Sequence, residues 1–363
     1  GGSQSQVRGN FGQKPFKFSP PDGFQPLNNA NLPRPTKAAV RPDKYFGAVI
    51  YDGDGGSSNT VTGLSFKPDL VWGKCRTGDT LPHNLFDVVR GFDKQLDAND
   101  TAAEVDRAGD AVTPLSNGFI LDATYCNINN GSTTNVAWCW KRSIESGFDI
   151  VTHTNTNDST VINHNLGKTP EFIITKCRTA NTTQWRAHHV SGGVSQTLIL
   201  STQEGFVASG ERVTAVSDTT FTYDATVTAN GNDFIHYVWT SVPGFSKFGS
   251  YTGNGSADGP FVNCGFKPAW VMVRRTDSTS ENWYINDSTR DPINVTGSSL
   301  MANQDRVEAT TGASFSATWD MLSNGFKFRD SGTGTNTSGV EYAFMAFAEA
   351  PTNNLFGAQT NAR

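Results

Sequence analysis

Short apolar runs alternate with polar turns along the whole of this 363-residue chain, and one pairing of turn and run occurs three times. The copies read LSFKPDLVWGKCRT (64–77), NLGKTPEFIITKCRT (165–179) and CGFKPAWVMVRRT (264–276). Each is a Lys-Pro or Lys-Thr-Pro turn followed by a run rich in β-branched and aromatic residues, which is typical of a β-strand. Because the unit recurs about every 100 residues, we predict tandem modules.

Further landmarks recur in the same order around these turns. LFDVVRG, WRAHHVSGG and INDSTRD follow them, at 85–91, 185–193 and 285–291. Apolar, aromatic runs close the units: VAWCW, IHYVW and AFMAF, at 136–140, 235–239 and 343–347. SNGF occurs at 116–119 and 323–326, and its Asn-Gly pair is a strong hairpin signal. The ordered landmarks extend the repeat over most of the chain.

The predicted fold is all-β, with three tandem antiparallel β-sandwich modules related by a pseudo-threefold internal repeat. An extended N-terminal strand and a Pro-rich linker precede them. The expected divisions are a terminal strand and linker, three modules and a C-terminal tail, at 1–43, 44–143, 144–243, 244–349 and 350–363. A single helical turn is expected at Thr101–Glu104, with Thr101 as its cap.

The charge, hydropathy and cysteine content of the chain argue against nucleic-acid binding, membrane insertion and a disulfide framework. The net charge is −5 and no Lys/Arg stripe is visible, so we predict no nucleic-acid partner. No apolar segment of membrane length appears, so we predict no membrane insertion. The five cysteines are odd in number and have no CxxC spacing, which indicates free thiols in a protein made in a reducing compartment. No cofactor is expected.

One resemblance extends over nearly the whole chain. NFGQKPFKFSPPDGFQPLN (10–28) resembles the last strand and exit of a SPRY-type β-sandwich of bacteriophage virion proteins. The GFKP turn, the SNGF turn and GFSKFGSYTGNGSADG (244–259) resemble an uncharacterised repeat family that follows such domains in phage tail-fibre-like proteins. The resemblance implies a virion role and supplies no catalytic residues. The orphan strand at 10–18 is expected to pair with something outside the modules.

Several residues admit both a chemical and a structural interpretation. Adjacent histidines on a strand point to opposite faces, which disfavours a metal site at His188 and His189, so metal is predicted as none. Asp52 and Asp54 resemble part of a calcium loop, but a turn is the better interpretation because the third copy lacks these carboxylates. Asp87 with Arg90, like Asp287 with Arg290, is interpreted as a local stabilising pair. The closing aromatics are interpreted as core: Trp138, Trp140, Trp239 and Phe347.

Three functions stay open from the sequence. The first is a tail-fibre or receptor-binding subunit of a virion, made in the host cytoplasm, a homotrimer with other tail proteins and a host glycan or receptor as partners. The second is a capsid decoration or head-fibre protein. The third is a polysaccharide-degrading tail enzyme, for which no residue spacing selects a carboxylate pair. The prediction is the first, with no enzymatic activity and no catalytic residues.

Recognition, if the chain makes host contact, is predicted at aromatics that differ between copies. The middle copy carries Trp185, His188 and His189, and the third carries Trp283 and Tyr284 nearby. Amphipathic aromatics on a polar surface suit both glycan and protein contact. The competing interpretation is that these side chains cover each module's own core.

Overall fold

The computed structural model describes residues 40–350 except 57, 79, 108–110, 123–126, 157, 226–227, 229, 278–279 and 310–315, and the backbone of 352–353 and 359–360. The expected N-terminal strand and Pro-rich linker lie outside the described residues. Regular structure in the described part is antiparallel β-sheet and two 3-10 helices, η1 (Pro42–Lys44) and η2 (Val190–Ser195). The all-β prediction is therefore confirmed.

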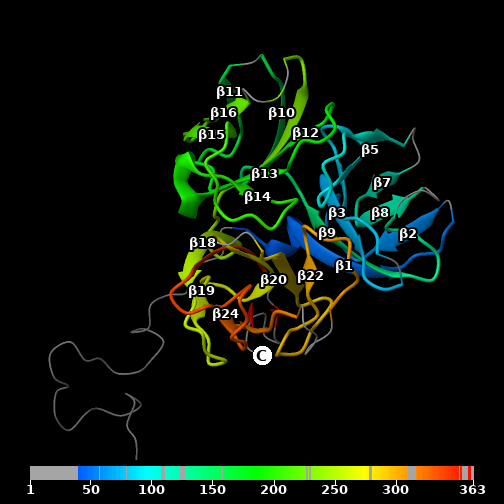
Figure 1. Cartoon of the computed structure of the whole chain (residues 1–363). Helices are drawn as coiled ribbons and strands as arrows, with labels where there is room; N and C mark the ends of the chain where they lie inside the picture. The colour runs from blue at the N-terminus through cyan, green and yellow to red at the C-terminus, as the bar shows by residue number, and fades with distance from the viewer. Residues whose placement is uncertain are drawn as a thin grey trace, which may run out of the picture. The chain divides into compact units, whose positions relative to one another are not determined.

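The strands form three sets, which we call modules 1, 2 and 3 (Figure 1). Module 1 contains β1 (Phe46–Asp52), β2 (Asn59–Thr62), β3 (Leu70–Cys75), β4 (Asn84–Asp87), β5 (Gly91–Asp97), β6 (Val105–Asp106), β7 (Val112–Leu115), β8 (Gly118–Leu121) and β9 (Thr134–Trp140). Module 2 contains β10 (Phe148–Thr154), β11 (Thr160–Asn163), β12 (Phe172–Cys177), β13 (Arg186–His189), β14 (Leu198–Ile199), β15 (Glu211–Val216), β16 (Thr220–Ala225) and β17 (Asp233–Trp239). Module 3 contains β18 (Ser246–Thr252), β19 (Phe261–Asn263), β20 (Pro268–Arg275), β21 (Trp283–Asp287), β22 (Leu300–Met301), β23 (Trp319–Leu322), β24 (Gly325–Phe328) and β25 (Glu341–Ala348). Two short strands follow, β26 (Thr352–Asn353) and β27 (Gln359–Thr360).

Each module is a sandwich of a large and a small antiparallel sheet with the same strand order. The large sheets run β1-β9-β3-β4-β5-β6, β10-β17-β12-β13-β14 and β18-β25-β20-β21-β22. The small sheets run β2-β8-β7, β11-β16-β15 and β19-β24-β23. The turn prolines Pro68, Pro170 and Pro268 lead into β3, β12 and β20, which hold the same middle position in their sheets. The three-module β-sandwich fold is thus present in the structure.

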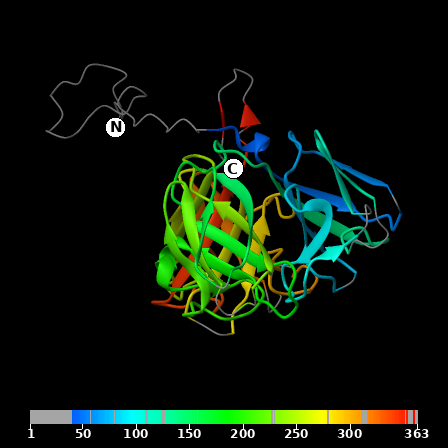
Figure 2. The same ribbon diagram turned by 90° about the horizontal axis from the view of Figure 1, so that it is seen from above.

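Successive side chains of a strand point to opposite faces of the sheet, so the two faces of each large sheet pack into different hydrophobic cores. In β9, Val136, Trp138 and Trp140 join one core shared by all three modules, whereas Ala137 and Cys139 face the small sheet of module 1. Strands β17 and β25 alternate in the same way. Because both faces are buried, these strands read as continuous apolar runs. The colours of Figure 1 and the turned view of Figure 2 follow the chain through the modules.

The closing aromatics are core residues, as predicted. Trp138 and Phe347 are completely buried, and Trp140 and Trp239 are 1% exposed. The Trp140 ring lies 6.3 Å from that of Trp239 and 5.6 Å from that of Phe347, so rings from all three modules meet. Aromatic pairs at this spacing contribute beyond their buried area.

The SNGF hairpins differ in detail from the prediction. The loop residues are Ser116 and Asn117, and Gly118 already pairs with Leu115 as the first residue of β8. A Cβ at Gly118 would lie 2.0 Å from the Val61 carbonyl oxygen, and one at Gly325 would lie 2.0 Å from that of Val262. Glycine is required there because the backbone of a neighbouring strand comes so close.

The predicted helical turn at Thr101–Glu104 is wrong, because this segment has neither helix nor turn structure. The Asp100 side chain accepts a hydrogen bond from the Ala102 backbone, and the Glu104 amide donates to the Arg178 carbonyl in module 2. These partners replace the intrahelical ones that a capped turn would need.

The remaining local predictions concern thiols and a loop. The described cysteines, Cys75, Cys139, Cys177 and Cys264, are free and buried; Cys126 lies outside the described residues. Asp54 accepts a hydrogen bond from the Gly56 amide at 2.7 Å, so its carboxylate closes a turn. In the described part of the chain no helix has the length and hydropathy needed to cross a membrane.

Candidate functional site: the junctions between modules

Three of the five predicted recognition residues, Trp185, His189 and Trp283, lie at the places where modules meet, which we call junctions 1–2, 2–3 and 3–1. Trp185 is completely buried and its Nε1 donates to the Asp97 carbonyl of module 1 at 2.8 Å. Trp283 is 2% exposed and its Nε1 donates to the Ile199 carbonyl of module 2 at 3.0 Å. A side chain held in this way has no surface to offer a partner.

The same contact recurs at junction 3–1 with a different residue. His83, Trp185 and Trp283 hold equivalent positions in the three modules. Each one immediately precedes the residue that pairs across the sheet with Gly73, Thr175 or Val273, respectively. His83 accepts from Trp72 Nε1 through Nδ1 and lies 3.0 Å from the Met301 carbonyl of module 3 through Nε2, which therefore carries the proton. Burial lowers the pKa of His83 well below its ordinary value and keeps it neutral. Three equivalent side chains thus connect the modules in a closed cycle.

A second cycle involves the residue that ends the fourth strand of each large sheet. Asp87 accepts from the Tyr237 hydroxyl of module 2 at 2.8 Å, and Asp287 accepts from Trp138 Nε1 of module 1 at 2.9 Å. His189 takes this place in module 2, and its Nε2 lies 3.1 Å from the Phe344 carbonyl of module 3. Its Nδ1 accepts from the Ser191 amide, so Nε2 is the donor to Phe344.

The predicted Asp–Arg pairs are confirmed, and each belongs to a network that crosses a junction. Arg90 and Arg290 are fully buried against Asp87 and Asp287, at 2.5 and 2.6 Å. Burial acts to lower the pKa of Arg90, but the negative charges of Asp87 and Glu104 raise it above its ordinary value. These guanidinium groups therefore stay charged inside the protein.

A glutamate carries each network to the next module. Glu104 lies 3.0 Å from Arg90 and holds Arg178 of module 2 by two hydrogen bonds, of 3.0 and 2.9 Å. Glu308 repeats this with Arg290 at 2.7 Å and with Arg76 of module 1 by two bonds of 2.9 Å. Bidentate pairs of this kind are the strong form of the salt bridge.

A buried cation occupies one further equivalent position in every module. Lys74 and Lys176 are fully buried, and each reaches a neighbouring module, with Nζ 3.1 Å from the Asp305 carbonyl and 3.0 Å from the Thr101 carbonyl. Burial lowers the pKa of both to about 8. Arg274 takes the place in module 3 and donates to the Glu281 carbonyl.

His188 and Tyr284 lie inside modules. His188 is 4% exposed and is paired across the ladder with Ile173, and burial lowers its pKa to about 4. Tyr284 is 8% exposed, and a Cβ at Gly334 would come within 2.4 Å of its ring. The exposed aromatic surface expected at Trp185–His189 and Trp283–Tyr284 is therefore not present, since strand alternation and the junctions bury all five side chains.

Within the described residues no group of three or more His, Cys, Asp or Glu side chains is arranged to hold a metal ion. The buried polar residues at the junctions form hydrogen bonds and ion pairs that hold one module against the next. Sequence reasoning missed His83, Glu104 and Glu308. The equivalence of His83 to the tryptophans could have been found by aligning strand starts, but the partners of the glutamates depend on the tertiary structure.

Comparison with known proteins identifies a family for this chain, and no activity is described for that family. No curated protein matches the chain. A family model described as "Domain of unknown function (DUF7483)" matches residues 41–351, which includes all three modules and their junctions. The chain therefore belongs to the family of domains of unknown function DUF7483.

Proposed function

We propose that this protein is a structural component of a bacteriophage particle, a tail-fibre or receptor-binding subunit that serves in host attachment. The observation that carries the proposal is the resemblance of the segment at 10–28 and the repeats at 64–347 to phage tail-fibre-like proteins. No enzymatic activity and no cofactor form part of the proposal.

The junctions agree with a load-bearing role. Their buried side chains bind other modules of the same chain, through neutral contacts at every junction and ion networks at two of them. Removing one partner of a buried ion pair costs about 3–5 kcal/mol, so such networks favour one arrangement of the modules. A fibre protein that transmits force between particle and host needs a fixed arrangement.

We propose that the surface loops of the protein contact the host. The side chains predicted for recognition at Trp185–His189 and Trp283–Tyr284 are buried. The exposed connections between strands are therefore the surface that we assign to binding of a glycan or receptor. The exposed apolar residue Ile293, 75% exposed, lies in such a connection after β21. Its replacement by Asp is expected to leave folding unchanged, because surface substitutions rarely shift stability by more than about 0.5 kcal/mol.

Imaging particles with a bound antibody fragment tests the location. Antibody raised against the purified protein should label the distal tail, and it should block adsorption of particles to host cells. Label on the head would favour the capsid decoration or head-fibre alternative. Absence of label from washed, intact particles would contradict a virion role.

The oligomeric state is a separate part of the proposal. We propose a homotrimer in the particle, by analogy with fibres rather than from any contact in the chain. The mass of the protein in solution, measured by light scattering on a chain that includes the upstream region, should be three times that of the chain. A monomer at micromolar concentration would contradict the trimer.

A further inference from the structure

Two of the six histidines donate hydrogen bonds across junctions, and both hold module 3. His83 of module 1 donates through Nε2 to the Met301 carbonyl at 3.0 Å, and His189 of module 2 donates through Nε2 to the Phe344 carbonyl at 3.1 Å. Both side chains are buried. Module 3 is therefore held by a buried histidine at each of its two junctions.

The corresponding donors at junction 1–2 are not histidines. Trp185 donates through Nε1 to the Asp97 carbonyl, and the Tyr237 hydroxyl donates to Asp87. An indole N–H takes up no proton, and burial raises the pKa of Tyr237 well above its ordinary value, so both donors stay neutral as the pH falls. The ion networks at junctions 1–2 and 3–1 pair arginines with carboxylates in the same way, so acid acts on both networks alike.

A second proton does not fit on His83 while junction 3–1 is closed. Its Nδ1 accepts from Trp72 Nε1 at 3.0 Å, so a proton there would set two donors against each other. The charged groups that face the ring are both cations, Lys74 on β3 and Arg290 in the connection after β21. Its other neighbours are the rings of Trp72 and Trp138. This surrounding of cations and apolar rings destabilises an imidazolium.

His189 is held in the same way at junction 2–3. Its Nδ1 accepts from the Ser191 amide at 3.2 Å, so this nitrogen also faces a donor. The titratable group nearest to it is His188 of the same strand, and the ring of Phe172 on β12 packs edge-on against it at 5.7 Å. On the side of β25 it meets the Phe344 carbonyl. Burial lowers the pKa of His189 to about 4.

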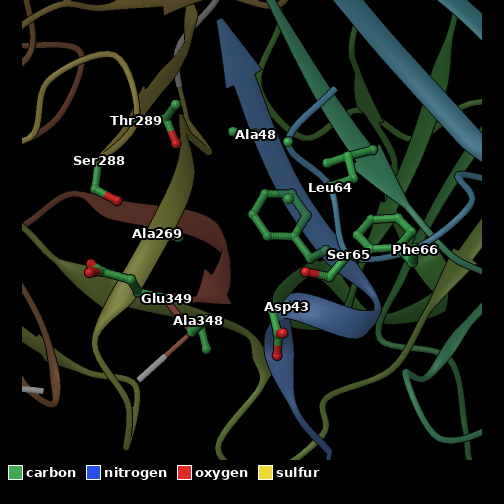
Figure 3. A pocket seen from close by; sticks show the side chains of 14 residues that line it. Asp43, Ala48, Leu64, Ser65, Phe66, Ala269, Ser288, Thr289, Ala348 and Glu349 are labelled. Atoms are coloured by element: carbon green, nitrogen blue, oxygen red, sulfur yellow. The ribbon is translucent and has the colours of Figure 1, made fainter. Parts of the chain in front are cut away.

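Module 3 is also the module with the fewest chain connections to the others. Residues 240–245 join it to module 2, and no described segment joins it to module 1. An open cavity of about 290 Å³ lies between modules 3 and 1, where Ser288 and Glu349 face Leu64 and Ser65 (Figure 3). Solvent therefore reaches one end of junction 3–1 before the junction opens, and module 3 can move away on a single tether.

Release of module 3 is costly, because rings of all three modules share one core. The ring of Trp270 lies 6.4 Å from that of Phe46, and the ring of Phe347 lies 5.6 Å from that of Trp140. Release exposes these rings to water, so the released form is rare at neutral pH. Acid can act only by changing the population of that form.

We propose that acid favours release of module 3, as a folded unit, from modules 1 and 2, because His83 and His189 bind a further proton only after release. In the released form both rings meet water and recover their ordinary acid–base behaviour. The docked form has its full stability above about pH 6.5, the ordinary histidine value, and loses it as the pH falls toward the lowered pKa of the docked rings. Each histidine raises the ratio of released to docked molecules up to about tenfold per pH unit, and the two together up to about a hundredfold. This inference does not depend on the proposed function.

Hydrogen exchange at one amide per junction reports which junction opens. The amides that donate across junctions 1–2, 2–3 and 3–1 are those of Glu104, Phe206 and Glu308. Their exchange rates in the full chain are measured by NMR between about pH 7 and pH 5, and each is divided by the rate of an unprotected amide at the same pH. We expect the protection of the Phe206 and Glu308 amides to fall by the same factor per pH unit, because release of module 3 breaks both bonds.

A matched variant removes the proton site of His83 and keeps a donor in its place. Module 2 carries Ile174 and Trp185 at the positions that Trp72 and His83 hold in module 1. Trp72→Ile combined with His83→Trp installs the module 2 pair, whose indole N–H does not titrate. Thermal melting checks that this double variant folds, and His83→Gln, which also keeps a donor without a titrating ring, replaces it if it does not.

The double variant should reduce the fall in protection per pH unit, by up to about tenfold, at the Phe206 and Glu308 amides. The same fall at the Glu104 amide should not differ between the variant and the natural protein. The Phe206 amide decides the question, because it reports on junction 2–3 while His83 lies at junction 3–1. His83 can affect it only if module 3 leaves both junctions together.

Three results would overturn the proposal. An unchanged pH dependence at all three amides of the variant shows that His83 does not govern release. A change at Glu308 alone shows that the two junctions of module 3 open independently. A change of the same size at Glu104 shows that acid unfolds the whole chain rather than releasing module 3.

Discussion

Among the described residues no ion pair crosses junction 2–3, whereas junctions 1–2 and 3–1 each contain a buried network of two arginines and two carboxylates. The neutral junction keeps the backbone contact of the charged ones. The Phe206 amide donates to the Thr276 carbonyl at 2.7 Å, where the Glu104 and Glu308 amides donate to Arg178 and Arg76. Phe206 and Thr276 therefore take the places of a glutamate and an arginine.

The difference between the junctions shows that the same arrangement of two modules can be held by different side-chain contacts. Main-chain hydrogen bonds and the positions of large side chains fix how one module meets the next. Side chains at those positions then change freely, from Asp87 to His189, provided that a donor meets an acceptor. A buried polar group without a partner costs about 1–3 kcal/mol, which favours side chains whose donors and acceptors match across a junction.

The largest expected effect comes from removing a carboxylate of a charged junction. Asp287→Ala leaves Arg290 without one partner and Trp138 Nε1 without its acceptor. Breaking a buried pair should lower the free energy of unfolding by about 3–5 kcal/mol. His189→Ala, at the neutral junction, should cost about 1–3 kcal/mol. Urea unfolding of both variants measures this, and an equal cost would contradict the ranking.

Acid should weaken module 2 more than module 3, which contains no histidine. Burial lowers the pKa of His188 and His189 to about 4, below the ordinary value of 6.5. Both are neutral in the folded and unfolded chain above pH 6.5. As the pH falls from 6.5 to 4, only the unfolded chain takes up these protons, so stability is lost, at up to about 1.4 kcal/mol per pH unit and histidine.

Hydrogen exchange at pH 7 and pH 5 locates that loss. Amides of β12 and β13 should exchange faster at pH 5, relative to those of β20 and β21 in module 3, which contains no histidine. A variant with His188→Asn and His189→Asn serves as the control, and its unfolding free energy should depend less on pH. Uniform acceleration in all three modules would show that other groups dominate.

A smaller effect is expected where a tryptophan loses only its hydrogen bond. Trp185→Phe keeps a ring in the shared core but removes one of the two hydrogen bonds to the Asp97 carbonyl, which still accepts from the Asp100 amide. The cost should be about 0.5–1.5 kcal/mol, the net contribution of one hydrogen bond. Trp283→Phe, at the neutral junction, should cost the same, because both junctions share this contact. A clear difference in urea midpoint would show that the two junctions are not equivalent here.

The smallest effect should come from the rim of a charged junction. Arg178→Lys keeps the charge opposite Glu104 but loses the bidentate geometry. The Arg178 side chain is 21% exposed, so solvent offsets part of the loss and about 0.5–1 kcal/mol is expected. High salt should reduce the difference between the variant and the natural protein. A loss equal to that of Asp287→Ala would contradict the ranking.

Repetition in the sequence was enough to predict the modules. The turn before Pro68 and its two equivalents, together with the closing aromatic runs, predicted which strands would recur and that Trp138 and Trp140 are core. These features are local, since a turn and an apolar run are read within about ten residues. The Asp87–Arg90 pair was also predicted, because its partners lie three residues apart in the chain.

The junctions were decided by the tertiary structure. From the sequence, Trp185 and Trp283 were candidates either for a recognition surface or for covering their own module's core, and Glu104 was assigned to a helical turn. The junction contacts were missed because the partners lie in another module, 88 and 74 residues away for Trp185 and Glu104. A repeat shows that modules resemble one another, but which faces meet depends on their packing. The sequence by itself therefore determined the strands and each module's own core, and only the packing of the three sheets decided which polar residues are buried together.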